Sequence, residues 1–220
     1  MVATPLLALF LEYRSAVLLA VVPMLVIALH WLVAHRRALP KSGVPRLLIP
    51  GIVLGALGGM WLQVALPQRT SLLLLAALLA FSVALPWGLQ RWQTDVSSGS
   101  RRAAPAFGIM AGVTESALNV GAPFVVLFAG LGRLTRAQQL IALNMCFFLG
   151  KIIQLSVLLA VTAIPMPSWT LAAAVGVSLA FHSAGDRFAG RFSDDVSRRW
   201  LGLFLSAMVV ALVLRAWGSS

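Results

Sequence analysis

The chain has 220 residues, of which 60% are hydrophobic and only 10% are charged, and its formal net charge is +11. Soluble domains carry about 25% charged residues, so this composition excludes a soluble domain and indicates an integral membrane protein. The basic residues lie in short loops between apolar segments, which is a membrane topology signal and argues against nucleic-acid binding. A single cysteine, Cys146, excludes an internal disulfide bond and a cysteine-based zinc site.

The first half of the chain predicts a short half-helix followed by three membrane spans. The half-helix covers Leu6–Leu11, with Thr4 as its N-cap and Pro5 at its first helical position. A basic loop separates the first two spans, and a polar linker at 91–104 follows the third. The three spans are predicted at Ser15–Ala34, Leu47–Leu66 and Ser71–Gln90.

The next apolar stretch, from Pro105 to Leu131, is broken in its middle. Its two parts, Ala106–Leu118 and Phe124–Leu131, are separated by the run NVGAP. Each part is shorter than the roughly 20 residues that a spanning helix needs. Irregular backbone at membrane depth survives only where it is buried in protein or lines a cavity, and broken helices carry the substrate sites of many transporters. We therefore expect a substrate site at this break.

Glycines recur every fourth residue in two segments. They are Gly51, Gly55 and Gly59 in the second span, and Gly108 and Gly112 before the break. Small residues at this spacing let two helix backbones approach closely. We expect the glycines of the second span to serve helix packing rather than ligand binding.

Three further spans are predicted after the broken stretch, and the arginines decide how that stretch is threaded. A re-entrant hairpin leaves only Arg14, Arg69 and Arg215 on the outer side. One full span would instead place Arg133, Arg136 and the arginines of the 186–199 loop outside, so the positive-inside rule favours the hairpin. The remaining spans are Ala137–Ala163, Trp169–Ala184 and Trp200–Trp217.

The two halves predict an inverted repeat. Residues 1–90 and 105–220 each contain a re-entrant element and three spans, joined by a cytoplasmic linker at 91–104, and Pro5 aligns with Pro123. Three is an odd number, so the halves have opposite orientations, as in many secondary transporters. The first half lacks a counterpart of Ala103–Val120, and we expect an upstream half-helix of about 20 residues to be missing. The predicted fold class is an all-α integral membrane protein.

Polar residues inside the apolar segments are the candidate site, because ionisable groups at such depth are costly and usually functional. Lys151 could neutralise an anion, and Asn119, Asn144 and Gln154 could orient it; Asn144, Lys151 and Gln154 share one helix face. Backbone N–H groups at the start of the second half-helix could cradle the same anion. These N–H groups belong to Gly121, Ala122, Phe124 and Val125.

Glu115 admits two interpretations. It could take up a proton and release Lys151, which would couple transport to a proton gradient. Alternatively, Glu115 and Lys151 form a pair that only holds the hairpin to the neighbouring span, since buried pairs in membranes are often structural.

No enzyme motif occurs: the chain has no H-E-x-x-H, no G-x-S-x-G and no Walker loop. The acidic residues are too few and too scattered for a metal cage. We therefore expect no enzyme activity, no metal and no cofactor. Without a nucleotide-binding loop, energy for transport must come from an ion gradient or from a partner.

The sequence GIMAGVTESALNVGAPFVVLF, followed by RLTRAQQLIALNMCFFLGK, resembles the sulfite exporter TauE/SafE family of membrane permeases. Members carry a Gly-Gly-Pro-like turn before an apolar helix in each of two repeats; here the turn is Gly121-Ala122-Pro123. The segment GIVLGALGGMWLQ also looks like the family. The resemblance implies transport of sulfur-containing anions such as sulfite, sulfoacetate or thiosulfate across the inner membrane.

The sequence thus predicts a multi-pass permease of the bacterial inner membrane that moves a small anion, plausibly a sulfur oxyanion or organosulfonate, driven by an ion gradient. Two alternatives stay open. One is a cation or proton-linked carrier in which Glu115 binds the cargo and Lys151 is its gate. The other is a non-transporting membrane subunit. The expected partners are the substrate and membrane lipid, not nucleic acid, and self-association is left open.

Overall fold

The structure, a computed structural model, describes residues 3–37, 44, 46–91, 100–161, 168–189 and 194–218. Within these ranges every regular element is an α-helix and no strand occurs, so the all-α prediction is confirmed. The helices are α1 (Ala3–Leu7), α2 (Tyr13–Ala34), α3 (Leu48–Ala65), α4 (Gln68–Arg91), α5 (Ser100–Leu118), α6 (Ala122–Leu131), α7 (Arg136–Val161), α8 (Ser168–Ala189) and α9 (Asp194–Gly218).

Five stretches of the described chain are long and apolar enough to cross a membrane. The span predicted at Trp169–Ala184 corresponds to α8, whose apolar part, Trp169–Gly185, is shorter than the roughly 20 residues of a full span. The broken stretch supplies the short apolar helix α6. The five stretches are Tyr13–Ala34, Leu48–Ala65, Gln68–Leu85, Arg136–Ala160 and Trp200–Gly218.

Several helix boundaries differ from the prediction, among them those of α1 and α5. Helix α1 covers Ala3–Leu7 instead of Leu6–Leu11, so Thr4 lies inside the helix rather than at its N-cap. The buried Thr4 side chain instead receives a long-range hydrogen bond from Asn119. Helix α5 begins at Ser100, so the last residues of the expected polar linker are helical.

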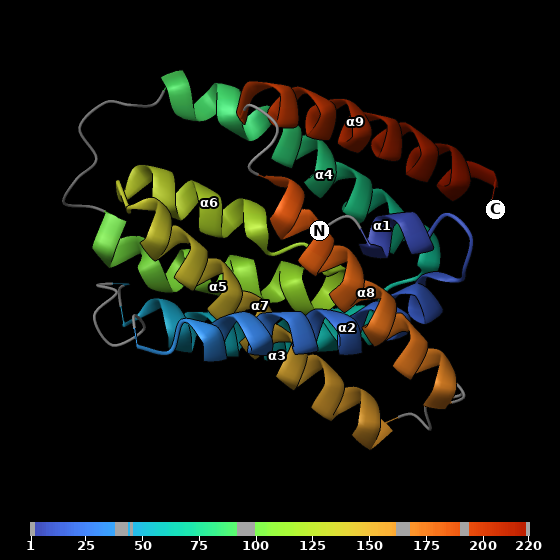
Figure 1. Ribbon diagram of the computed structural model, residues 1–220. Coiled ribbons are helices and arrows are strands. Elements are labelled where there is room, and N and C mark those ends of the chain that lie inside the picture. Colours follow the sequence, from blue (N-terminus) through green and yellow to red (C-terminus); the bar gives the residue numbers. More distant parts are fainter. Residues whose placement is uncertain are drawn as a thin grey trace.

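The helices form one packed bundle in which the break between α5 and α6 lies inside (Figure 1). Helices α3, α5 and α7 contact one another, and α2 packs against α7 and α8. Helices α5 and α6 also pack together, so the chain turns back at the break instead of continuing in one line. Helix α9 lies along α4 at the top of Figure 1. These contacts surround the break with protein, as irregular backbone at membrane depth requires.

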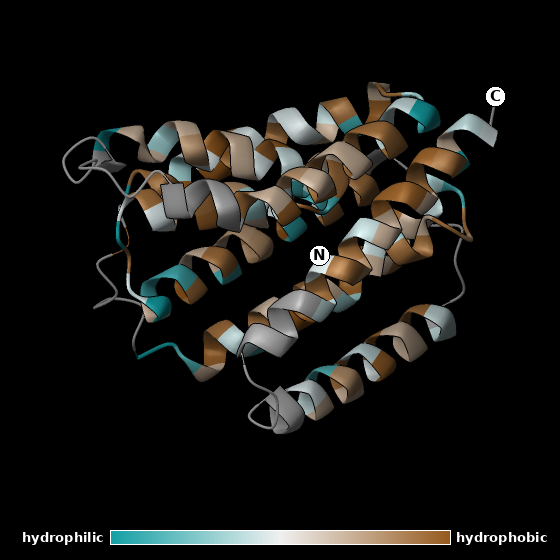
Figure 2. Cartoon of the chain, turned by 90° about the horizontal axis from the view of Figure 1, so that it is seen from above, coloured by the Kyte–Doolittle hydropathy of each residue, from teal (hydrophilic) through white to brown (hydrophobic). Residues whose placement is uncertain are grey.

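The outer surface of the bundle is apolar. Hydrophobic residues run along the helices in Figure 2, whereas hydrophilic residues occur mainly near helix ends. Large apolar side chains are exposed on several helices; Leu159 and Phe181 are examples. Trp61, Trp169 and Trp217 are exposed near the ends of their helices, as an aromatic belt at the membrane interface requires. This surface fits contact with lipid.

Glycines bring α3 and α5 into backbone contact, as the spacing predicts. A Cβ atom on Gly51 would lie 2.5 Å from the carbonyl oxygen of Pro105, and one on Gly108 would lie 2.5 Å from that of Leu48. Gly55 faces the backbone of Ile109 in the same way. Any larger side chain would push the two helices apart. Helix α3 therefore holds α5 in a defined place.

The break after α5 has a local cause. Asn119 adopts a left-handed conformation with φ of 59°, which asparagine tolerates better than most residues. The N–H of Asn119 donates to Glu115 O and that of Val120 to Thr114 O, which terminates the helix. Pro123 follows in the first turn of α6, where a missing N–H costs nothing. The chain is thus stopped and restarted within a few residues.

The turn after α1 is held from the opposite end of the chain. The Arg215 guanidinium of α9 donates to the carbonyl oxygen of Ala8 and, at 2.8 Å, to that of Leu11. These carbonyls follow the last turn of α1 and have no place in a helix ladder. Arg215 thereby ties the start of the described chain to its last helix.

Several predicted loops lie largely outside the described residues. They are the basic loop after α2, the middle of the linker and the turn after α7, at 38–43, 45, 92–99 and 162–167. The charged loop predicted at 186–199 is wrong over most of its length, because 186–189 belong to α8 and 194–199 to α9; only 190–193 lie outside the described residues. The division of the chain into two repeats stays a prediction.

Candidate functional site

A charged pair lies buried at the break between α5 and α6. The Nζ atom of Lys151 in α7 is 2.7 Å from Oε1 of Glu115 in the last turn of α5, and both side chains are 0% exposed. An isolated charge at such depth would be strongly unfavourable, so each group depends on the other. The pairing considered from the sequence is therefore present.

Lys151 is surrounded by oxygen atoms from two helices. Besides the Glu115 carboxylate, its ammonium group donates to Asn119 Oδ1 at 2.5 Å, Gln154 Oε1 at 3.0 Å and the backbone oxygen of Glu115 at 3.3 Å. An ammonium group has three protons, so these acceptors saturate it. In this arrangement Lys151 has no donor left for another ligand.

The Glu115 carboxylate occupies the position in which an anionic ligand was expected. Its Oε2 atom accepts a hydrogen bond of 2.8 Å from the N–H of Gly121, the residue before α6. Its Oε1 atom, which accepts no further hydrogen bond, faces Lys151. A carboxylate thus bridges the cation and the start of α6, where backbone N–H groups favour negative charge.

Neutral side chains extend the pair into a network, which we call the buried cluster. Asn119 Nδ2 donates to Thr4 Oγ1 at 2.8 Å, and Gln154 Nε2 donates to Gln63 Oε1 at 3.1 Å and to the backbone oxygen of Ser116 at 2.9 Å. The hydroxyl of Ser116 is buried without a hydrogen-bond partner. The buried cluster consists of Thr4, Gln63, Glu115, Ser116, Asn119, Lys151 and Gln154.

The packing around the pair depends on glycine at two positions. A Cβ atom on Gly150 would lie 2.7 Å from Cγ of Glu115, and one on Gly121 would lie 2.8 Å from Cβ of Glu115. These absent side chains leave the space that the Glu115 carboxylate fills. The buried Cys146 lies beside Gly121.

The structure brings most of the predicted site residues together, but not all. Gln154, Asn119 and Gly121 join the pair through hydrogen bonds. Asn144 does not join: it lies two helical turns from Lys151 and donates to Leu140 O of its own helix. Ala122 and Val125 are buried at the start of α6, and the Phe124 ring packs against Phe81.

Two members of the buried cluster, Thr4 and Ser116, were not expected in the site, and Gln63 was not assigned to it. All three are small or neutral polar residues within apolar segments, and that was their only sequence signal. Their contacts join α1 and α3 to the break, over separations that no local pattern encodes. In the described part of the chain, no group of three or more His, Cys, Asp or Glu side chains could hold a metal ion.

An all-α membrane bundle with a broken helix and a buried ionisable pair is typical of membrane transport proteins. The family model described as sulfite exporter TauE/SafE matches residues 1–212, and the chain belongs to this family. Neither a curated protein nor a solved structure matches the chain. The family consists of membrane permeases rather than enzymes, which agrees with the absence of enzyme motifs from the sequence.

Proposed function

We propose that this permease moves a small sulfur oxyanion or organosulfonate across the bacterial inner membrane, and that the buried cluster binds it. The observation that carries the proposal is the Glu115 carboxylate between Lys151 Nζ and the Gly121 N–H. A sulfonate or sulfite group presents the same oxygen acceptors as a carboxylate. It could therefore take over both contacts when the Glu115 side chain releases them.

Charge balance connects this exchange to protons. The closed pair is neutral, because one carboxylate faces one ammonium group. If Glu115 takes up a proton, Lys151 keeps an unpaired charge that an anion can neutralise. With a singly charged anion the buried cluster then stays neutral in both states, which avoids the large penalty of an uncompensated charge at membrane depth. One proton on Glu115 would accompany each such anion.

The residues of the break would share the work of binding. Lys151 would supply the charge, and Asn119 and Gln154, which already bond its ammonium group, would keep that group aimed at the break. The unpartnered Ser116 hydroxyl is an additional donor close to the pair. The N–H groups of Gly121, Ala122, Phe124 and Val125 would face the anion at the start of α6.

A structural role for the pair is the second candidate, because every proton of Lys151 already has an acceptor. In that case the chain would be a non-transporting member of its family. The cation carrier has no comparable support, since both Glu115 oxygens face donors rather than an open site.

The test is uptake of radiolabelled sulfite, thiosulfate and sulfoacetate into proteoliposomes. Glu115→Gln keeps the size of the side chain and removes its titration. We expect this variant to exchange labelled for unlabelled anion without responding to a proton gradient. Wild type should accumulate anion when the source compartment is more acidic. The double variant Glu115→Gln/Lys151→Met should lose at least about tenfold in both assays, because no cation remains at the break.

Asn144→Ala is the matched control, since Asn144 lies on the same helix outside the buried cluster. It should transport like wild type. Normal anion flux through the double variant would show that Lys151 does not bind the transported anion. Absence of flux for all three anions, with folded wild-type protein, would favour the structural role.

A further inference from the structure

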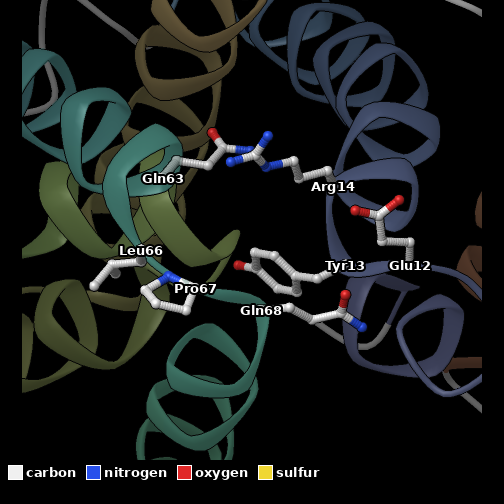
Figure 3. Close-up of a pocket in the computed structure, with 7 residues that line it drawn as sticks. All are labelled: Glu12, Tyr13, Arg14, Gln63, Leu66, Pro67 and Gln68. Atoms are coloured by element: carbon white, nitrogen blue, oxygen red, sulfur yellow. The ribbon is translucent and has the colours of Figure 1, made fainter. Parts of the chain in front are cut away.

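A second polar site lies between the buried cluster and one end of the bundle. It is a cavity of about 160 Å³ where α2 begins, α3 ends and α4 begins (Figure 3). One ordered water needs roughly 10–15 Å³ of cavity volume, so several waters or one small oxyanion fit. The Arg14 side chain extends across it toward Gln63 (Figure 3).

The lining of this cavity is suited to an anion. Arg14 brings the positive charge, and Gln63, Gln68 and Tyr13 bring neutral polar groups. One Arg14 nitrogen donates to the backbone oxygen of Val64 at 3.1 Å, which positions the guanidinium and leaves its other N–H donors available. A planar guanidinium with several donors recognises oxyanions in a defined orientation.

Glu12 is the one acidic side chain in the lining. It is exposed, and Figure 3 shows its carboxylate on the far side of the cavity from Gln63. Water weakens the interaction between exposed charges, so Glu12 opposes an anion at Arg14 only slightly.

The wall of the cavity is bonded directly to the buried cluster. Gln63 is 6% exposed; its Oε1 atom accepts from Gln154, whose own Oε1 accepts from Lys151. Tyr13 also contributes, because its hydroxyl donates at 2.8 Å to Ala117 O in the last turn of α5. Two hydrogen bonds thus lead from Gln63 to the Lys151 ammonium group, and the Tyr13 bond reaches the α5 backbone two residues after Glu115.

The end of the bundle that carries the cavity is opposite the basic loop that follows α2. Under the positive-inside rule this end faces the outside. We propose that the Arg14 cavity is an outer binding site for the transported oxyanion, which holds the anion two side chains, Gln63 and Gln154, away from Lys151. The inference rests on the proposed function for the identity of the anion, but the charge of its site, Arg14, lies outside the buried cluster.

The first experiment measures retention of radiolabelled sulfite by purified protein in equilibrium dialysis, which needs no transport. Wild type should retain sulfite at two sites. Arg14→Gln should lose one site and Glu115→Gln/Lys151→Met should lose the other. Unchanged retention in Arg14→Gln overturns the outer site, whereas unchanged retention in the double variant overturns the buried one. Retention of none of sulfite, thiosulfate or sulfoacetate by wild type overturns both.

The second experiment separates charge from shape. Arg14→Cys should raise KM for anion supplied from outside by about tenfold at unchanged maximal rate, which corresponds to the loss of one favourable ionic contact. A cationic thiol reagent should restore KM and an anionic thiol reagent should not. Cys146 is buried, so wild type should not respond to either. Arg69→Cys, outside the cavity, is the matched control. Equal effects of the two reagents on Arg14→Cys would contradict an anion site.

Discussion

The two halves of the chain contribute differently to the buried cluster. The second half supplies both charges, Glu115 and Lys151, whereas the first half supplies only neutral groups from Thr4 and Gln63. The Arg14 cavity reverses this pattern, because its arginine belongs to the first half. An anion that moved between the two sites would pass from a charge of the first half to a charge of the second half.

Packing also differs between helices that the predicted repeat makes equivalent. Every glycine of the α3 stripe that the sequence singled out meets the backbone of α5, whereas a Cβ on Gly176 or Gly185 of α8 would meet nothing within 4 Å. Helix α3 is therefore fixed against a helix that carries site residues, whereas these two positions of α8 are open. The repeat itself stays a prediction.

The largest loss of folded protein is expected from substitution of a glycine in the contact between α3 and α5. Gly55→Leu places a side chain against the Ile109 backbone and forces α3 away from α5, so we expect loss of folded protein. Gly176→Leu in α8 is the matched control and should change stability by less than about 0.5 kcal/mol. Size-exclusion chromatography in detergent, with a fluorescent fusion, reports both. Equal yields of the two variants would show that α3 and α5 do not depend on close packing.

A smaller loss of stability is expected when the buried charges of the second half are removed. Lys151→Met leaves Glu115 buried without a partner, which should cost about 3–5 kcal/mol. Glu115→Gln/Lys151→Met removes both charges, so its thermal stability should lie nearer to that of wild type. The midpoint of thermal aggregation in detergent measures the difference. A double variant less stable than Lys151→Met would mean that the two charges do not act as a pair.

The neutral contribution of the first half should have the smallest effect of the three. Thr4→Val removes the acceptor of the Asn119 amide and leaves a buried donor unsatisfied, at a cost of about 1–3 kcal/mol. Thr114→Val is the control, because the Thr114 hydroxyl bonds only carbonyl groups of its own helix. The same thermal assay applies. If the two variants have the same thermal midpoint, the hydrogen bond from α1 does not stabilise the break.

Much of the fold could be predicted from composition and periodicity. The apolar segments are long, and their ends are marked by arginine, proline and tryptophan, so five spanning stretches were located within a few residues. The break was also predictable, because asparagine, glycine and proline all disfavour a continuous helix. The boundaries of α1 were not, since its segment is short and its polar residue bonds across the bundle instead of capping its own helix.

The candidate site was predictable only in part, for a related reason. Glu115, Asn119, Lys151 and Gln154 are conspicuous because polar groups are rare in apolar segments. Helical spacing placed Asn144 on the same face, yet its side chain bonds the Leu140 carbonyl of its own helix and does not reach the pair. No local signal assigned Gln63 or Thr4 to the site, because their partners lie 91 and 115 residues away in the chain.

The sequence by itself determined the class of this protein: an all-α membrane protein with rare polar groups near one helix break, because bilayer energetics act on each residue separately. Only the tertiary structure decided how those groups are used. It placed the Glu115 carboxylate between Lys151 and Gly121, saturated the ammonium group and opened a cavity beside Arg14. These arrangements depend on which helices pack together. The glycines of α3 and α5 allow close contact between these two helices, but their spacing in the sequence does not say which helix is the partner.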